Sequence, residues 1–166
     1  PDVLKVFDEP LQGPGPGDVR LKVEALGLNR AEVMLREGKY VTVPQFPARI
    51  GIEAAGIVDA VGEGVTDVKV GERVSAVPFL SWDQFGNWIP DSVVKYGVYG
   101  ESAVVPAWTV ARNPEGTSAV DAAAIWCQYL TAWGGMVDYA GLNQESIVLV
   151  TAASSSAGLG ALQIAK

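Results

Sequence analysis

The sequence lacks histidine and has one cysteine, Cys127, among its 166 residues. A single thiol excludes an internal disulfide framework and is typical of a reducing compartment. Basic residues are also few, since 12 Lys and Arg stand against 19 Asp and Glu, and they form no cluster. Because nucleic acids and anionic membrane surfaces are bound through clustered cations, this composition argues against both as partners.

Export and membrane insertion find no support either. The start, PDVLKVFDEP, has no basic region followed by an apolar core, so the cytoplasm is the expected location. One uncharged stretch, 146–165, has about the length of a membrane span, but its hydroxyl residues and glycines argue against that interpretation. With 49% hydrophobic and 19% charged residues, the composition is that of a globular protein.

The first two thirds of the chain are rich in strand patterns. Alternating apolar and polar residues predict a half-buried strand over 19–26. Further strands are predicted over 54–61, 72–77 and 101–105, and a short helix over 30–36. Many short strands separated by glycine and proline, with few helices, predict a partly open β-barrel.

The character of the sequence changes near Pro114. Thr117, Ser118 and Asp121 are residues that commonly begin helices, and the apolar segment 122–136 that follows is expected to pack between two domains. Before this point lies a long loop, which we interpret as a lid or an interface segment. Its aromatic residues are Phe79, Trp82, Phe85, Trp88 and Tyr96.

The last segment predicts one strand, a tight turn and the opening of a helix. An apolar run at 147–150 is typical of a buried parallel strand, and it is followed by small residues over 151–160. Such a turn lets backbone amides approach a ligand, and a helix N-terminus attracts a pyrophosphate. The spacing of Ala152, Ser155 and Gly158 departs from G-x-G-x-x-G, so an ordinary buried strand–helix unit remains an alternative.

Six segments, in this order, resemble the medium-chain dehydrogenase/reductase superfamily, especially its zinc-independent quinone oxidoreductase-like branch. They are GLNRAEVMLREGKY, FPARIGIEAAGIVDAVGEGV, KVGERV, YGESAVVP, LTAW and the final turn. The resemblance implies a mainly β GroES-like barrel over 1–113, with its first strand missing. It also implies inter-domain helices and the start of an α/β Rossmann domain for NAD(P) over 114–166, truncated after the first βα unit.

The resemblance also bears on the metal. In the zinc-dependent members a Cys, a His and a second Cys hold catalytic zinc, and the matching positions here are Asn29, Ile52 and Cys127. Because catalytic zinc needs three protein ligands, the resemblance implies no metal site and no zinc. Cys127 is then interpreted as a small buried apolar residue rather than a ligand or nucleophile. Ala31 stands where the zinc enzymes carry the hydroxyl that begins a proton relay.

Without a metal, the expected substrate is a small, hydrophobic, electron-poor quinone or α,β-unsaturated carbonyl. Hydride adds at carbon, and hydrogen-bond donors then stabilise the charge on oxygen. Asn29 is the first candidate donor, with stabilisation of a turn as the alternative. Tyr40 and Tyr99 are candidate donors or proton sources, with packing as the alternative. Glu53 either meets the substrate or, as we favour, holds an Arg or a backbone amide.

The resemblance implies NADPH as the cofactor, with NADH possible because the residue that distinguishes them is expected beyond Lys166. Thr131 matches a family position beside the nicotinamide, and Arg30 lies either near the cofactor phosphates or on the solvated surface. The pyrophosphate turn is matched by Ser154, Ser155, Ser156, Ala157 and Gly158.

Two further expectations concern the whole protein. The full-length enzyme is expected to be a homodimer, whereas the 166-residue fragment alone is expected to be inactive and to bind dinucleotide weakly or not at all. The competing interpretations are a zinc-dependent alcohol dehydrogenase-like enzyme and a non-enzymatic binding protein that retains the fold.

Overall fold

The computed structural model describes residues 3–40, 43, 45–78, 85, 87 and 95–166. The strands are β1 (Asp18–Leu26), β2 (Ala54–Val61), β3 (Arg73–Ala76), β4 (Ser102–Pro106) and β5 (Val110–Arg112). The helices are α1 (Arg30–Arg36), the 3-10 helix η1 (Ala107–Thr109), α3 (Ala119–Ala122), α4 (Trp126–Trp133), the π-helix η2 (Gly134–Tyr139) and α5 (Ser156–Ile164). Within the described ranges, no helix is both long and apolar enough to cross a membrane.

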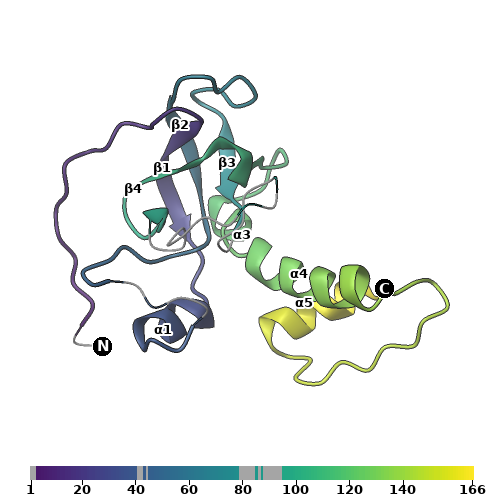
Figure 1. Cartoon of the computed structure of the whole chain (residues 1–166). Coiled ribbons are helices and arrows are strands. Elements are labelled where there is room, and N and C mark those ends of the chain that lie inside the picture. Colours follow the sequence, from purple (N-terminus) through teal and green to yellow (C-terminus); the bar gives the residue numbers. More distant parts are fainter. Residues whose placement is uncertain (1–2, 41–42, 44, 79–84, 86, 88–94) are drawn as a thin grey trace.

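The strands form one antiparallel sheet, ordered β4-β1-β2-β3-β5. Two irregularities in the β1–β2 pairing, between Arg20 and Leu21 and between Val23 and Ala25, interrupt the ladder. Because such bulges bend a strand and increase its twist, they help an open sheet to curl. Figure 1 shows this β-rich part at one end of the molecule, with α4 and α5 packed side by side at the other.

The core of the sheet follows the alternation of the sequence. Val19 and Leu21 of β1 are fully buried, and they cluster with Val58 of β2, Val74 of β3 and Val105 of β4. Burial of a Val or Leu side chain stabilises a fold by about 1.5–3 kcal/mol. These shared apolar contacts therefore explain why the four predicted strands form.

The helix signals after Pro114 are confirmed. Ser118 is the N-cap of α3, and its hydroxyl accepts a hydrogen bond from the backbone N–H of Asp121 at 3.1 Å. Ala122 and Ala123 then pack against Ala55 of β2. The apolar segment 122–136 therefore runs from the end of α3, which lies on the sheet, through α4, which leads away from it, into η2 (Figure 1).

Residues 147–150 do not form the predicted buried strand. They are assigned to no strand, and Ile147 and Leu149 are 100% and 90% exposed. A parallel strand needs neighbouring strands to pair its backbone and helices to cover its faces, and the part of the chain that is described offers it no parallel neighbour. The helix of the predicted unit, α5, does form and packs on α4.

The aromatic loop can be followed only in part. Phe79, Trp82 and Trp88 lie outside the described residues. Phe85 is exposed, whereas Tyr96 packs against the core of the sheet. The interpretation of this loop as a lid or an interface segment stays a prediction.

Candidate functional site

A buried carboxylate, that of Glu53, joins the sheet to the helical part of the chain. Its side chain is 1% exposed and immediately precedes β2. Oε1 accepts hydrogen bonds from the backbone N–H groups of Trp126 at 2.6 Å and Cys127 at 3.2 Å, the first two residues of α4. Oε2 accepts from Nδ2 of Asn29 at 3.2 Å. The expectation that Glu53 holds a backbone amide is confirmed.

Gly27 allows the loop that carries Asn29 to reach this carboxylate. Its backbone N–H donates to the Glu53 carbonyl at 2.9 Å. A Cβ at this position would lie 2.4 Å from the carbonyl oxygen of Ala123 and 2.7 Å from Oε2 of Glu53. Only a residue without a side chain fits between these groups, so Gly27 sets the distance between the loop, β2 and the end of α3.

Asn29 also begins a helix, as the alternative interpretation expected. It is the extended N-cap of α1, and its backbone N–H donates to Oε2 of Glu32 at 2.9 Å. Glu32 is 5% exposed, and its other oxygen accepts from the N–H of Ile52 at 3.2 Å. Burial raises the pKa of the Glu32 carboxyl, and its hydrogen bonds lower it. Asn29 is thus held through both its backbone and its side chain.

The Tyr99 hydroxyl joins Gly27, Asn29, Glu32 and Glu53 in one hydrogen-bonded group, the glutamate cluster. It donates to the carbonyl oxygen of Gly27 at 3.0 Å, and its ring lies so close to Gly51 that a Cβ there would be 2.1 Å from Cδ1. Burial, followed by the charges of Glu32 and Glu53, raises the pKa of Tyr99 to about 12. The packing role is therefore present, and a role as proton source stays a prediction.

Tyr40, the third predicted catalytic residue, is half-buried. Its pKa is raised by burial first, and then by the negative charges of Cys127 and Glu32. Hydrogen bonds therefore join Asn29 and Tyr99 to the group around the two buried glutamates, whereas the link of Tyr40 to this group is electrostatic.

The titration of Tyr99 gives a pH-dependent prediction for stability. Because its folded pKa of about 12 exceeds the unfolded value of about 10, its contribution is complete below pH 10 and is lost as the pH rises through 12. Tyr99→Phe keeps the ring beside Gly51 but loses the hydroxyl and its hydrogen bond, which costs about 1 kcal/mol near neutral pH. Urea unfolding should show a smaller loss of stability above pH 10 in Tyr99→Phe than in the wild type. If the free energy of unfolding fell equally with pH in both proteins, this prediction would be wrong.

Cys127 is half-buried rather than fully buried. Burial raises the pKa of its thiol, and the charges of Glu53 and Glu32 raise it further. A raised pKa keeps the thiol protonated, whereas metal ligation and nucleophilic attack both use the thiolate. In the described part of the chain, no group of three or more His, Cys, Asp and Glu residues is arranged to hold a metal ion.

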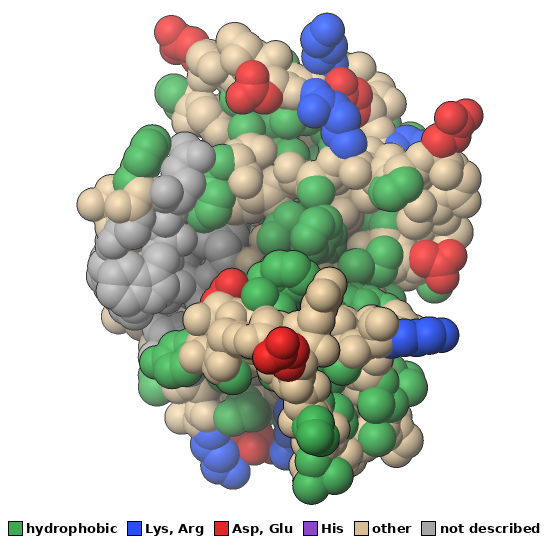
Figure 2. Space-filling view, turned by 90° about the vertical axis from the view of Figure 1, so that its right-hand side faces the viewer, with side chains coloured by type: hydrophobic (Ala, Val, Ile, Leu, Met, Phe, Trp, Pro, Cys, Tyr) green, Lys and Arg blue, Asp and Glu red, His purple; other side chains and the backbone are tan. Residues whose placement is uncertain are grey.

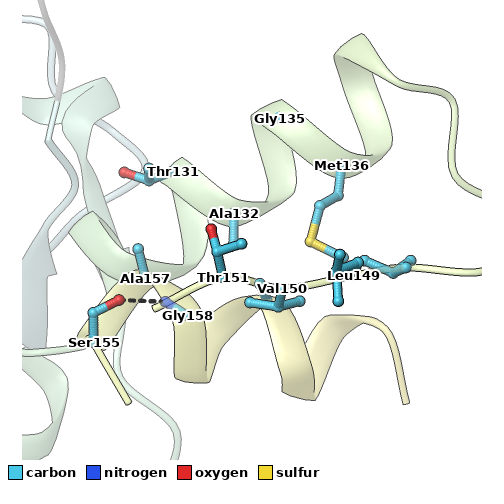
Figure 3. Close-up of a pocket in the computed structure, with 12 residues that line it drawn as sticks. Thr131, Ala132, Gly135, Met136, Leu149, Val150, Thr151, Ser155, Ala157 and Gly158 are labelled. Atoms are coloured by element: carbon cyan, nitrogen blue, oxygen red, sulfur yellow. Dashed lines mark hydrogen bonds between the residues drawn. The ribbon is translucent and has the colours of Figure 1, made fainter. Parts of the chain in front are cut away.

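A pocket of about 340 Å³ lies between α4, η2, residues 148–151 and the start of α5 (Figure 3). Of the residues predicted to bind the cofactor, Thr131, Ser155, Ala157 and Gly158 line it. Ser154 and Ser156 are not among the lining residues, although they belong to the same turn. Arg30 begins α1, is exposed and does not line the pocket, and its place near the cofactor phosphates stays a prediction.

The turn before α5 has the shape of an anion site. Ser155 is the N-cap, and its Oγ accepts from the N–H of Gly158 at 3.1 Å, as the dashed line in Figure 3 shows. A Cβ on Gly158 would lie 2.4 Å from the carbonyl oxygen of Ala152. Ser156 and Ala157 are the first residues of the helix, so their N–H groups have no acceptor within it. These groups fit a pyrophosphate, and the hydroxyl hydrogen of Ser155 remains a further donor.

The glutamate cluster and the pocket share helix α4. Thr131 lies one turn after Cys127, and its Oγ1 donates to the Cys127 carbonyl at 2.6 Å. Hydrogen bonds therefore run from Asn29 through Glu53 to Cys127, and from Cys127 to Thr131. Asn29 and Thr131 belong to one connected unit.

Two contributors to this unit were missed in the sequence. Glu32 stands three residues after the N-cap Asn29, a capping-box spacing that could have revealed it. Trp126, whose indole Nε1 donates to Oγ of Ser75 at 2.7 Å, anchors the start of α4 on β3. No local pattern in the sequence signals that contact, because its two residues are far apart along the chain.

Known proteins share this architecture. The alcohol dehydrogenase GroES-like domain family matches residues 15–115. The chain is 37% identical to the synaptic vesicle membrane protein VAT-1 homolog of Rattus norvegicus, over 99% of this chain and 37% of the relative. It is 34% identical to a quinone oxidoreductase of Sus scrofa, over 100% of this chain and 46% of the relative.

Solved structures with a similar fold belong to the same kind of protein. An NAD-dependent alcohol dehydrogenase matches with a TM-score of 0.88 at 35% identity, over 99% of this chain and 51% of that chain. Mycobacterial Rv1454c complexed with NADPH matches with a TM-score of 0.80 at 30% identity, over 98% of this chain and 45% of that chain.

The chain thus spans between about a third and a half of the length of these relatives. The open antiparallel sheet with few helices, followed by the start of a Rossmann unit, confirms the predicted fold class. The chain belongs to the medium-chain dehydrogenase/reductase superfamily and contains its alcohol dehydrogenase GroES-like domain.

Proposed function

We propose that the protein is an NAD(P)H-dependent oxidoreductase that reduces quinones or α,β-unsaturated carbonyls by hydride transfer without a catalytic metal. In this proposal residues 1–113 supply the substrate side and residues 114–166 begin the cofactor domain. The observation that carries it is the connected unit of Asn29, Glu53, Cys127 and Thr131. It links a hydrogen-bond donor in the GroES-like domain to the wall of the pocket beside α5.

A nicotinamide dinucleotide would supply the hydride when bound. The free N–H groups of Ser156 and Ala157 would hold its pyrophosphate, Gly158 would let the turn close around it, and Thr131 would line its path. The NADPH complex of one structural neighbour supports NADPH, and the NAD-dependent neighbour keeps NADH as the alternative.

The donor set at the glutamate cluster does not fit catalytic zinc. Three ligands with an open fourth position are needed. Both carboxylates accept hydrogen bonds from backbone N–H groups, and the thiol of Cys127 has a raised pKa. Ligation would require these groups to give up their present partners. This chemistry supports a metal-free reduction.

Activation of the substrate then rests on hydrogen bonds. The Asn29 amide would donate to the carbonyl oxygen as negative charge develops there, an interaction that strengthens in the transition state. Both tyrosine phenols are protonated at neutral pH, the state required of a donor, and the raised pKa values of Tyr40 and Tyr99 extend this state to higher pH. The substrate is a small, hydrophobic, electron-poor molecule, and the intact protein is a cytoplasmic homodimer without nucleic-acid or membrane partners.

The test is turnover by the intact protein. We expect oxidation of NADPH, followed by absorbance, to depend on a quinone or enone and to persist after prolonged treatment with a metal chelator. Oxidation of simple alcohols with NADP⁺ serves as the contrasting reaction and should be absent. Activity that disappears on chelation and returns with zinc would establish the zinc-dependent alternative. Failure with every acceptor would favour a binding protein that retains the fold.

A further inference from the structure

The Glu53 carboxylate has an unusual set of partners for a buried charge. It is 1% exposed and forms no ion pair within the described residues. Neutral donors alone satisfy it, namely two backbone N–H groups of α4 and the side-chain amide of Asn29. Burying a carboxylate is costly unless such bonds are in place, so the loss of any one of them affects the others.

The two oxygens of Glu53 have separate tasks. Oε1 accepts from the first two residues of α4, where a negative charge also interacts favourably with the helix dipole. Oε2 accepts one hydrogen of the Asn29 amide. An amide nitrogen carries two hydrogens, so this bond fixes the direction of the second and the position of the amide oxygen.

We propose that Glu53 is a positioning residue that aims the Asn29 amide and, with the same carboxylate, fixes the start of the helix that carries Thr131. This inference rests on the proposed function, because it is the Glu53 carboxylate that would align the Asn29 amide, the donor to the substrate, with Thr131, which lines the proposed cofactor pocket. Misalignment of a reacting group by about 1 Å can cost a factor of about 100 in rate. A carboxylate is suited to this role because both of its oxygens accept.

Glutamine at position 53 keeps the size of the side chain but cannot both hold the start of α4 and accept from the Asn29 amide. Its single oxygen can satisfy α4 or Asn29, but not both. If the oxygen serves α4, the glutamine NH₂ faces the Asn29 NH₂, and the amide of Asn29 must turn its oxygen toward position 53. The donor aimed at the substrate is then displaced without removal of any catalytic residue.

The experiment compares kcat, KM and thermal unfolding of the intact wild type, Glu53→Gln and a matched control. The control is Asp59→Asn, which removes a negative charge at the surface, where Asp59 pairs with Arg20 at 2.8 Å. For Glu53→Gln we expect kcat with a quinone to fall about 10–100-fold, while KM for NADPH changes less than about twofold. Asp59→Asn should retain the kcat of the wild type.

A reciprocal double variant separates the stabilising contact between positions 29 and 53 from the supply of a donor at position 29. In N29D/E53Q, the glutamine oxygen can hold α4 while its NH₂ donates to the new carboxylate at position 29. We expect the melting temperature to recover relative to N29D, where two carboxylates face each other, while kcat stays low because position 29 has no donor.

The outcomes are distinguishable. Wild-type kcat in E53Q overturns the positioning role and leaves the proposed function intact. Recovery of both stability and kcat in the double variant overturns the positioning role and also removes the Asn29 amide from the reaction. An intact wild type that reduces no acceptor overturns the proposed function together with this inference.

Discussion

Replacing Asn29 with alanine in the intact protein should lower kcat for quinone or enone reduction about 100-fold. Loss of one preorganised donor to a developing oxyanion typically costs a factor of about 100–1000. The KM for the nicotinamide cofactor should change little, because Asn29 is not among the residues that line the pocket beside α5. Steady-state kinetics with the acceptor and the cofactor varied in turn would separate the two parameters.

A loss of stability accompanies this substitution and has to be measured separately. Alanine removes the N-cap side chain of α1, which costs about 1 kcal/mol, and leaves Oε2 of Glu53 without its donor. Asn29→Ser is the matched control because serine is also a good N-cap but lacks the amide. We expect Asn29→Ser to unfold closer to the wild type than Asn29→Ala while its kcat is equally low. Wild-type kcat in both variants would remove Asn29 from the reaction.

The strands of this domain follow from local sequence because each contributes apolar side chains to the core on one face of the sheet. Alternation placed Val19 and Leu21 inside, and both are fully buried in β1. The three-residue β5 was missed because 110–112 is too short to display a period of two. The opposite error occurred at 147–150, where an apolar run was interpreted as a buried strand. An apolar run shows that a segment can be buried. Whether it is buried as a strand depends on neighbouring strands that pair with it.

The candidate site was also predictable only in part from the sequence. Glu53 was expected to hold a backbone amide, and it does, but the partner on α4 lies 73 residues further along the chain. Nothing local in the sequence specifies that pairing. The requirement for glycine at position 27 is equally non-local, because the oxygens that exclude a side chain belong to Glu53 and Ala123. Residue types therefore predicted the chemistry of the cluster, and the tertiary fold determined which groups meet.

This close approach gives Gly27→Ala a large expected effect on stability. The new Cβ would lie 2.4 Å from the Ala123 carbonyl oxygen and 2.7 Å from Oε2 of Glu53, well inside normal contact. Neither oxygen can move freely, since Ala123 is buried against β2 and the Glu53 carboxylate is fixed by α4 and Asn29. Overpacking of this kind costs about 1–3 kcal/mol, and we expect about 3 kcal/mol because hydrogen bonds are also disturbed.

The matched control is Gly134→Ala at the end of α4. Gly134 has helical backbone angles, and a Cβ there would meet nothing within 4 Å. Alanine at such a position stabilises a helix by up to about 1 kcal/mol, so the two substitutions should shift the urea midpoint in opposite directions. A midpoint for Gly27→Ala equal to that of the wild type would mean that the loop before α1 does not lie against Glu53. The hydrogen-bonded connection from Asn29 through Glu53 to α4 would then be absent as well. The same close approach of the loop brings the Asn29 amide within hydrogen-bond distance of the Glu53 carboxylate.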